Sequence, residues 1–138
     1  MLFRSLRLRK RLWDSASEED HRDEMVAIIE EPDSQFVAVA DAGDGRLAGF
    51  LEASIRTYVE DCETDNVGYL EGWYVDEDFR QQGLGTELVR AAEQWARSHG
   101  CSEMASDAEL GNELSQQAHE KLGYTETSRL VHFRKELS

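Results

Sequence analysis

The order of hydrophobic and polar positions predicts two helices at the start of the chain. Apolar residues between Leu2 and Trp13 are spaced as on one helix face, and arginine and lysine fill the other face. A second helix is expected over residues 18–31. Ser17 followed by Asp20 resembles a capping box there, acidic residues fill the first turn, and a proline ends the apolar stripe.

Strand patterns joined by turn signals follow these helices. Residues 35–41 and 46–58 have strand composition and flank the turn cluster at 42–45, so the pair predicts a β-hairpin. Residues 67–75 (VGYLEGWYV) form a near-continuous apolar run, which is typical of a buried strand. Its single charge, Glu71, requires an explanation, because burying an unpaired carboxylate is costly.

The second half of the chain continues to alternate. It predicts a helix that ends at Gly100, a strand at 101–107, an amphipathic helix at 112–122 and two short strands within 124–137. The order ααβββαβαβ(β) indicates an alternating α/β or α+β fold. With 138 residues and no linker, the chain is expected to form a single domain, residues 1–138.

The net charge of the chain limits the kinds of molecule that it is expected to bind. The chain has 29 acidic against 15 basic residues and a formal charge of -14, which disfavours nucleic acid and anionic membranes and suits a cationic partner. The acidic excess also has a simpler interpretation, as a solubility device or a trait of a salt-loving or high-GC host. No apolar run reaches eighteen residues, so no membrane span is predicted.

The two cysteines carry no recognisable site. Cys62 and Cys101 lack a Cys-x-x-Cys spacing and neighbouring histidines, so neither a metal site nor a redox motif is predicted. The arginine-rich start is followed by no secretory signal. Reduced thiols and a cytoplasmic location are therefore expected.

A glycine loop is the strongest chemical signal. Arg80-x-x-Gly83-x-Gly85 directly follows a predicted strand and opens a predicted helix. Glycines there let backbone N–H groups approach an anion, and the helix N-terminus adds the positive end of its dipole, which predicts a pyrophosphate cradle. A plain glycine turn before a helix is the alternative. The third glycine of a dinucleotide fingerprint and the Gly-Lys-Ser/Thr of a triphosphate loop are absent.

Several segments together resemble the GCN5-related N-acetyltransferase family over residues 35–138. They are Trp73-Tyr74-Val75, Arg80-Gln81-Gln82-Gly83-Leu84-Gly85, Asn112 and Leu122-Gly123-Tyr124. The resemblance implies the family's fold, with a central mixed sheet splayed at an acetyl-CoA cleft.

The same resemblance implies how the cosubstrate acetyl-CoA is held. Its pyrophosphate would lie on the amides of residues 81–86, its pantetheine arm would pair with the main chain of residues 73–75, and Asn112 would contact CoA. The implied cofactor-binding residues are Trp73, Tyr74, Val75, Arg80, Gln81, Gln82, Gly83, Leu84, Gly85, Thr86 and Asn112.

More specific strings resemble the aminoglycoside 6′-N-acetyltransferases, which acetylate the 6′-amine of these antibiotics. The resemblance implies that Glu71 and Asp107 lie at the acceptor side of the cleft and that Trp13 and Tyr58 wall the sugar site. The strings are Leu8-Arg9-x-x-Leu12-Trp13, Ala53-Ser54-Ile55-Arg56, Leu70-Glu71-Gly72, Phe79-Arg80-Gln81, Glu103-Met104-Ala105-Ser106-Asp107, Ser115-Gln116 and Leu122-Gly123-Tyr124-x-Glu126-Thr127.

The chemistry of the residues agrees with that assignment. Carboxylates at the ends of two strands would bind the ammonium groups of an aminoglycoside. The attacking amine must lose a proton, and Glu71 is the first candidate for the base. A structural ion pair of Glu71 with Arg56 or Arg80, and a strand-end cap by Asp107, are the alternatives.

The remaining catalytic expectations concern the thioester. Backbone N–H groups of residues 73–75, freed where strands splay, would bind its oxygen. The family often places a tyrosine near the departing sulfur, whereas this chain has His119 there, which could donate to the thiolate or simply pack on its helix. A Ser106–Asp107–His119 hydrolase is disfavoured, because no nucleophile-elbow motif is present.

The family usually begins with a strand that this chain has no room for, so the first strand is expected to be missing, either because the start is truncated or because the fold forms without it. An open sheet edge would result, which a partner chain could cover. A homodimer is therefore expected, with Val131, His132 and Phe133 near the partner. Two other functions stay open: an acetyltransferase for another polyamine or a protein amine, and a weakly active acyl-CoA-binding module.

Overall fold

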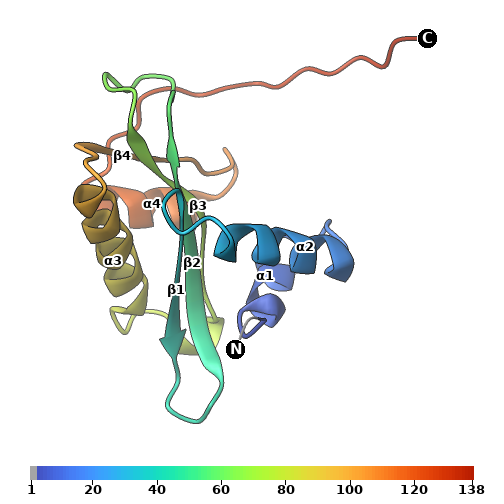
Figure 1. The fold of residues 1–138 in the computed structure, drawn as a ribbon, viewed down its shortest axis with the longest axis vertical. Coiled ribbons are helices and arrows are strands. Elements are labelled where there is room, and N and C mark those ends of the chain that lie inside the picture. The colour runs from blue at the N-terminus through green and yellow to red at the C-terminus, as the bar shows by residue number, and fades with distance from the viewer. Residues whose placement is uncertain (1–2) are drawn as a thin grey trace. The chain divides into compact units, whose positions relative to one another are not determined.

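Up to the helix that ends at Lys121, helices and strands follow one another in the predicted order (Figure 1). The computed structural model describes residues 3–138, so Met1 and Leu2, the latter expected on the first helix, lie outside the described residues. Two compact units, Met1–Asp107 and Ala108–Ser138, are distinguished. The elements are α1 (Leu6–Leu12), α2 (Glu18–Ile29), β1 (Gln35–Asp41), β2 (Leu47–Arg56), β3 (Val67–Val75), the short 3₁₀ helix η1 (Glu77–Phe79), α3 (Leu84–Ser98), β4 (Glu103–Ser106) and α4 (Glu113–Lys121).

A four-stranded mixed sheet in the order β1-β2-β3-β4 is the centre of the first unit. The predicted hairpin is confirmed, because β1 pairs with β2 antiparallel, as β2 does with β3. Strand β4 is parallel to β3 but pairs only with Val67–Leu70. Among the described residues, β3 therefore has an open edge from Glu71 onward on the β4 side.

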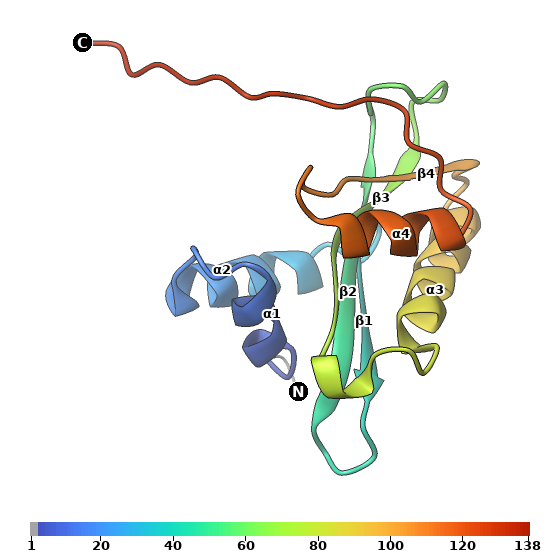
Figure 2. The ribbon, with the colours of Figure 1, turned by 180° about the vertical axis from the view of Figure 1, so that it is seen from behind.

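Helices cover both faces of the sheet (Figures 1 and 2). Helices α1 and α2 lie on one face, where Leu8 and Phe50 are fully buried together. Helix α3 lies on the other face, and its Trp95 stacks on Phe36 of β1 with ring centroids 5.2 Å apart. The α2 cap forms as predicted, since Ser17 accepts a hydrogen bond from the Asp20 N–H. No helix within residues 3–138 is long and apolar enough to cross a membrane.

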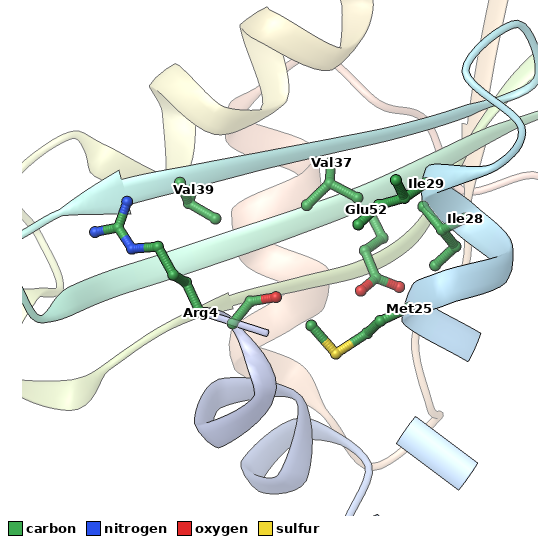
Figure 3. A pocket seen from close by; sticks show the side chains of 8 residues that line it. Arg4, Met25, Ile28, Ile29, Val37, Val39 and Glu52 are labelled. Atoms are coloured by element: carbon green, nitrogen blue, oxygen red, sulfur yellow. The ribbon is translucent and has the colours of Figure 1, made fainter. Parts of the chain in front are cut away.

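Strand β1 lies at an edge of the described sheet, and an apolar hollow of about 450 Å³ runs beside it (Figure 3). Val37 and Val39 of β1 are 39% and 42% exposed there. The hollow contains none of the residues predicted for catalysis or binding, so it is separate from the candidate site. It is lined by Arg4, Ser5, Met25, Ile28, Ile29, Val37, Val39 and Glu52.

The second unit corrects one prediction. Helix α4 forms with Asn112 as its N-cap, but the two strands expected within residues 124–137 do not form. An isolated two-stranded hairpin is marginal in water, because its strands need further partners for their main chain and apolar face. Residues 125–138 are exposed instead, with Phe133 at 92%.

Candidate active site

Glu71 occupies a β-bulge in β3. Glu52 of β2 pairs with Gly72, and the next β2 residue pairs with Leu70, so Glu71 is the extra residue. Side chains alternate between the faces of a strand, and a bulge shifts that alternation by one residue. Glu71 therefore lies on the sheet face covered by α1, whereas Trp73, only two residues later, lies beside Gly85 of α3.

The Glu71 carboxylate has three hydrogen bonds from β2. The Ser54 hydroxyl donates to Oε2, and Arg56 donates from Nε to Oε2 at 3.0 Å and from Nη2 to Oε1 at 2.7 Å. The ion pair with Arg56 expected as an alternative is thus present. Arg80 instead donates to the carbonyl of Val75 at 2.8 Å. A carboxylate held in this way keeps a fixed orientation, and its side chain remains 32% exposed to incoming molecules.

Asp107 is connected to Glu71 through two side chains. The Tyr69 hydroxyl donates to Asp107, and the Arg56 guanidinium lies over the Tyr69 ring, 3.6 Å from its centroid. Burial first, and the hydrogen bond to Asp107 second, raise the pKa of Tyr69, so its hydroxyl remains a donor. The hydrogen bond that Asp107 accepts comes from the Tyr69 side chain, whereas a strand-end cap would accept from backbone N–H groups. Tyr69 was missed from the sequence, although its spacing of two from Glu71 was a signal.

The glycine loop leaves backbone donors open at the start of α3. Gly83 is the N-cap with φ +83°, and this cap supplies no side-chain hydrogen bond to the first turn. The first intrahelical bond runs from the Glu87 N–H to the Gly83 carbonyl at 3.0 Å, so the amides of the first turn point out of the helix. Such amides, with the helix dipole, fit a pyrophosphate.

Two glycines have different roles in that loop. A Cβ added at Gly83 would meet no atom within 4 Å, which leaves space for a ligand to approach the backbone. A Cβ at Gly85 would lie 3.3 Å from the Trp73 ring, so this glycine allows β3 and α3 to approach closely. Arg80 fixes the other end of the loop through its bond to Val75 and its position 5.6 Å from the Tyr74 ring centroid.

Trp13 lies against Gly72, the residue that follows Glu71, and its role as a wall of the acceptor site stays a prediction. A Cβ added at the adjacent Gly72 would overlap the Trp13 ring, and the ring packs edge-on against Phe50 with centroids 6.0 Å apart. The role of Tyr58 as a second wall of the acceptor site stays a prediction. Tyr58 is 76% exposed in the loop after β2.

Buried polar side chains contact Trp13 and hold it in place. The Arg9 side chain is 1% exposed, lies 4.8 Å from the Trp13 ring centroid and pairs with Glu52 of β2 and Glu24 of α2. His21 accepts a hydrogen bond at Nδ1 from Arg9 Nε at 3.3 Å. Its Nε2 therefore carries the proton and donates to the Trp13 carbonyl at 3.0 Å. Burial raises the pKa of Glu52, and Arg9 opposes that rise.

The second unit contains the other two predicted residues. The Asn112 side-chain oxygen accepts from the Ser115 N–H at 3.1 Å, so Asn112 caps α4. His119 Nδ1 donates to the Ser115 carbonyl at 2.7 Å, and its ring packs edge-on against Tyr124 at 5.9 Å. The packing alternative for His119 is thus present. The expected roles of both residues toward CoA remain predictions.

Comparison with known proteins identifies the family to which the chain belongs. Residues 5–124 match the Acetyltransferase (GNAT) family, and the chain belongs to this family, so the predicted resemblance and fold are confirmed.

Individual relatives have names that are more specific than the family. The aminoglycoside N(6′)-acetyltransferase type 1 of Klebsiella aerogenes is 43% identical over 136 residues, covering 96% of this chain and 88% of the relative. The solved structure of AAC(6′)-Iy with the bisubstrate analog CoA-S-monomethyl-acetylneamine has a TM-score of 0.91 at 38% identity, covering 99% of this chain and 92% of that one. Apo AAC(6′)-Ig from Acinetobacter haemolyticus has a TM-score of 0.88 at 42% identity, covering 96% and 90%.

Proposed function

We propose that this protein is an acetyl-CoA-dependent aminoglycoside 6′-N-acetyltransferase formed by one domain, residues 1–138. The observation that carries the proposal is the joining of Glu71 and Asp107 into one network beside the open edge of β3. Two carboxylates within one network suit an acceptor with several ammonium groups. The names of the relatives above support the same substrate class.

Acetyl-CoA supplies an acetyl group activated as a thioester. The open amides of residues 83–86 would bind its pyrophosphate, with Arg80, Gln81 and Gln82 lining the loop. The main-chain groups of residues 73–75 on the open edge of β3 would pair with the pantetheine arm. Asn112 would contact CoA through its amide N–H₂, because its oxygen already caps α4.

Glu71 is proposed as the base. Among the described residues, Arg56 alone donates to Oε1, which leaves a lone pair for the proton of the attacking 6′-amine. Backbone N–H groups of residues 73–75 would stabilise negative charge on the thioester oxygen as the N–C bond forms and the C–S bond breaks. His119 would donate a hydrogen bond to the departing thiolate from Nε2, which requires the doubly protonated ring, because Nδ1–H is bound to the Ser115 carbonyl.

The other acceptor contacts follow from charge and shape. Asp107 would hold further ammonium groups of the sugar, since it is exposed and fixed by the Tyr69 hydroxyl. Trp13 would provide one wall beside Glu71, and Tyr58, which is exposed in its loop, the other.

The test is acetylation of kanamycin, with the modified nitrogen located by NMR. Acetylation at the 6′-nitrogen is expected. Turnover of other polyamines or a protein amine but not of kanamycin would favour an acetyltransferase with a different acceptor. Binding of CoA without turnover of any amine in the panel would favour an acyl-CoA-binding module.

A cytoplasmic homodimer is also proposed. Cys62 and Cys101 are free thiols, which suits a reducing compartment. The apolar side chains of Val131 and Phe133 are 72% and 92% exposed, and exposed apolar groups of this kind are commonly covered by a partner. Sedimentation should give a dimer at micromolar concentration, and Phe133→Asp should shift it toward monomer. A wild-type monomer under these conditions would contradict the dimer.

A further inference from the structure

Arg56 places a positive charge inside a site whose proposed substrate is itself positively charged. Its guanidinium spans both oxygens of Glu71, and the ring beneath it belongs to Tyr69, whose hydroxyl binds Asp107. The same cation thus lies between the two carboxylates that are proposed to hold substrate ammonium groups. Like charges repel, so a substrate cannot occupy that position while Arg56 does.

The ion pair between Arg56 and Glu71 is open to displacement by another cation. The side chains of Arg56 and Glu71 are 42% and 32% exposed, so solvent and solutes reach the pair. An ion pair at this level of exposure contributes little net free energy, because water replaces most of its attraction. A polycation with several simultaneous contacts can therefore compete with it.

Ser54 allows the exchange without loss of the Glu71 geometry. Its hydroxyl donates to Oε2, whereas within residues 3–138 the hydrogen bond to Oε1 comes from Arg56. When the guanidinium leaves, Oε2 stays anchored to β2 and Oε1 becomes free. Oε1 is then the atom that accepts a hydrogen bond or a proton from an incoming amine.

We propose that Arg56 is a placeholder cation: its guanidinium pairs with Glu71 in the free protein and is displaced from Oε1 by a substrate ammonium group. This inference rests on the proposed function. Arg56 then acts as an affinity-setting residue that competes with substrate. A residue that only holds Glu71 in place would have the opposite effect on binding and turnover when removed.

The test compares Arg56→Gln with the matched control Arg22→Gln. Both changes remove one positive charge from an ion pair, and the two arginine side chains are 42% and 43% exposed. Because the net charge changes equally, a general gain in attraction for cations appears in both variants. Affinities for kanamycin and for spermidine are measured by calorimetry, and kcat and KM by steady-state acetylation.

Arg56→Gln is expected to tighten kanamycin binding about threefold to fivefold beyond any change in Arg22→Gln. This factor corresponds to the free energy of about one exposed ion pair, which the substrate no longer has to break. The KM for kanamycin should fall by a larger factor than any change in kcat, and Arg56→Lys, which keeps the charge, should lie between wild type and Arg56→Gln. The proposal is overturned if Arg56→Gln binds kanamycin more weakly than wild type or gains no more affinity than Arg22→Gln. A large fall in kcat also overturns it.

The spermidine measurement separates this proposal from the proposed function. If kanamycin binds neither wild type nor variant while spermidine binds more tightly to Arg56→Gln than to the control, the aminoglycoside assignment fails and the placeholder stands. If neither cation binds either protein, Arg56 competes with nothing and the placeholder is overturned.

Discussion

The ring of Trp13 lies directly over Gly72, at the position that a Cβ of residue 72 would occupy. Leu12 closes the same space, with its Cδ2 3.2 Å from that Cβ position. Helix α1 can therefore approach β3 only because residue 72 is glycine. The contact sets the distance between the proposed acceptor wall and Glu71, which precedes Gly72 in the strand.

Gly72→Ala should displace Trp13 and weaken acceptor binding. Overpacking of this kind costs about 1–3 kcal/mol, because the ring or the strand must move. We expect a higher KM for kanamycin and a lower free energy of unfolding in urea, with CoA affinity unchanged. The double variant Trp13→Phe, Gly72→Ala provides the control, since a smaller ring leaves space for the methyl group. No recovery of stability in the double variant would contradict this packing account.

Gly83→Val should weaken CoA binding by about 2 kcal/mol or more, because its side chain would fill the space through which phosphate approaches the amides. Valine is also strained at the φ of +83°. Gly45→Val is the matched control: Gly45 has φ +84°, its Cβ would also meet nothing within 4 Å, and it lies in the β1–β2 turn. Equal CoA affinities for the two folded variants would contradict the cradle.

Glu52 should make the protein less stable as the pH rises. Burial raises its pKa in the folded state, so the folded protein retains a proton that the unfolded chain has already released. This contribution is full below the ordinary pKa of a glutamate and is lost as the pH passes the raised value. The difference in unfolding free energy between wild type and Glu52→Gln should therefore fall from pH 4 upward.

Removing Arg9, the ion-pair partner of Glu52, provides the control for this prediction. Arg9→Met should destabilise the protein by about 3–5 kcal/mol at neutral pH, because the Glu52 charge would stay buried without its partner. The loss should shrink at low pH, where Glu52 takes up a proton. If the unfolding free energies of Glu52→Gln and Arg9→Met both differ from wild type by an amount that does not change with pH, Glu52 does not titrate in the folded protein.

Local signals carried much of the fold prediction. The apolar run of β3, the cap Ser17 and the glycine at the start of α3 are each readable from a few neighbouring residues, and each is found as expected. The strands expected after Tyr124 are wrong for the converse reason. Their composition suits a strand, but pairing needs a neighbour that local composition does not reveal.

The missed parts of the site depend on pairing between distant segments. The bulge at Glu71 arises from the register of β2 against β3, and the Tyr69–Asp107 hydrogen bond arises where β4 lies parallel to β3. Arg9 meets Glu52, 43 residues later in the chain, only when α1 covers β2. The resemblance and the charge in a buried strand therefore indicated Glu71, Asp107 and the Arg56 alternative, whereas the contacts of Ser54 and Tyr69 required the assembled sheet.

Glu71 and Asp107 should have separable kinetic roles. Glu71 lies two residues before the main chain expected to hold the thioester, on a bulge that fixes its carboxylate toward Ser54 and Arg56. Glu71→Gln should lower kcat by about 10² or more if proton removal limits the rate. Single-turnover rates are the proper measure, because slow product release would hide the effect.

Asp107→Asn should instead raise the KM for kanamycin and tobramycin more than it lowers kcat, because it removes binding that is equal in ground and transition states. Tyr69→Phe is the matched test of its support: losing the hydroxyl that holds Asp107 should produce the same kinetic pattern in weaker form. CoA affinity, measured separately, should not change in any of the three variants. Wild-type single-turnover rates for Glu71→Gln over a range that includes acidic pH would rule out Glu71 as the base. Deprotonation of the amine in solution or by water would then be the simpler mechanism, with Glu71 left as an ammonium ligand.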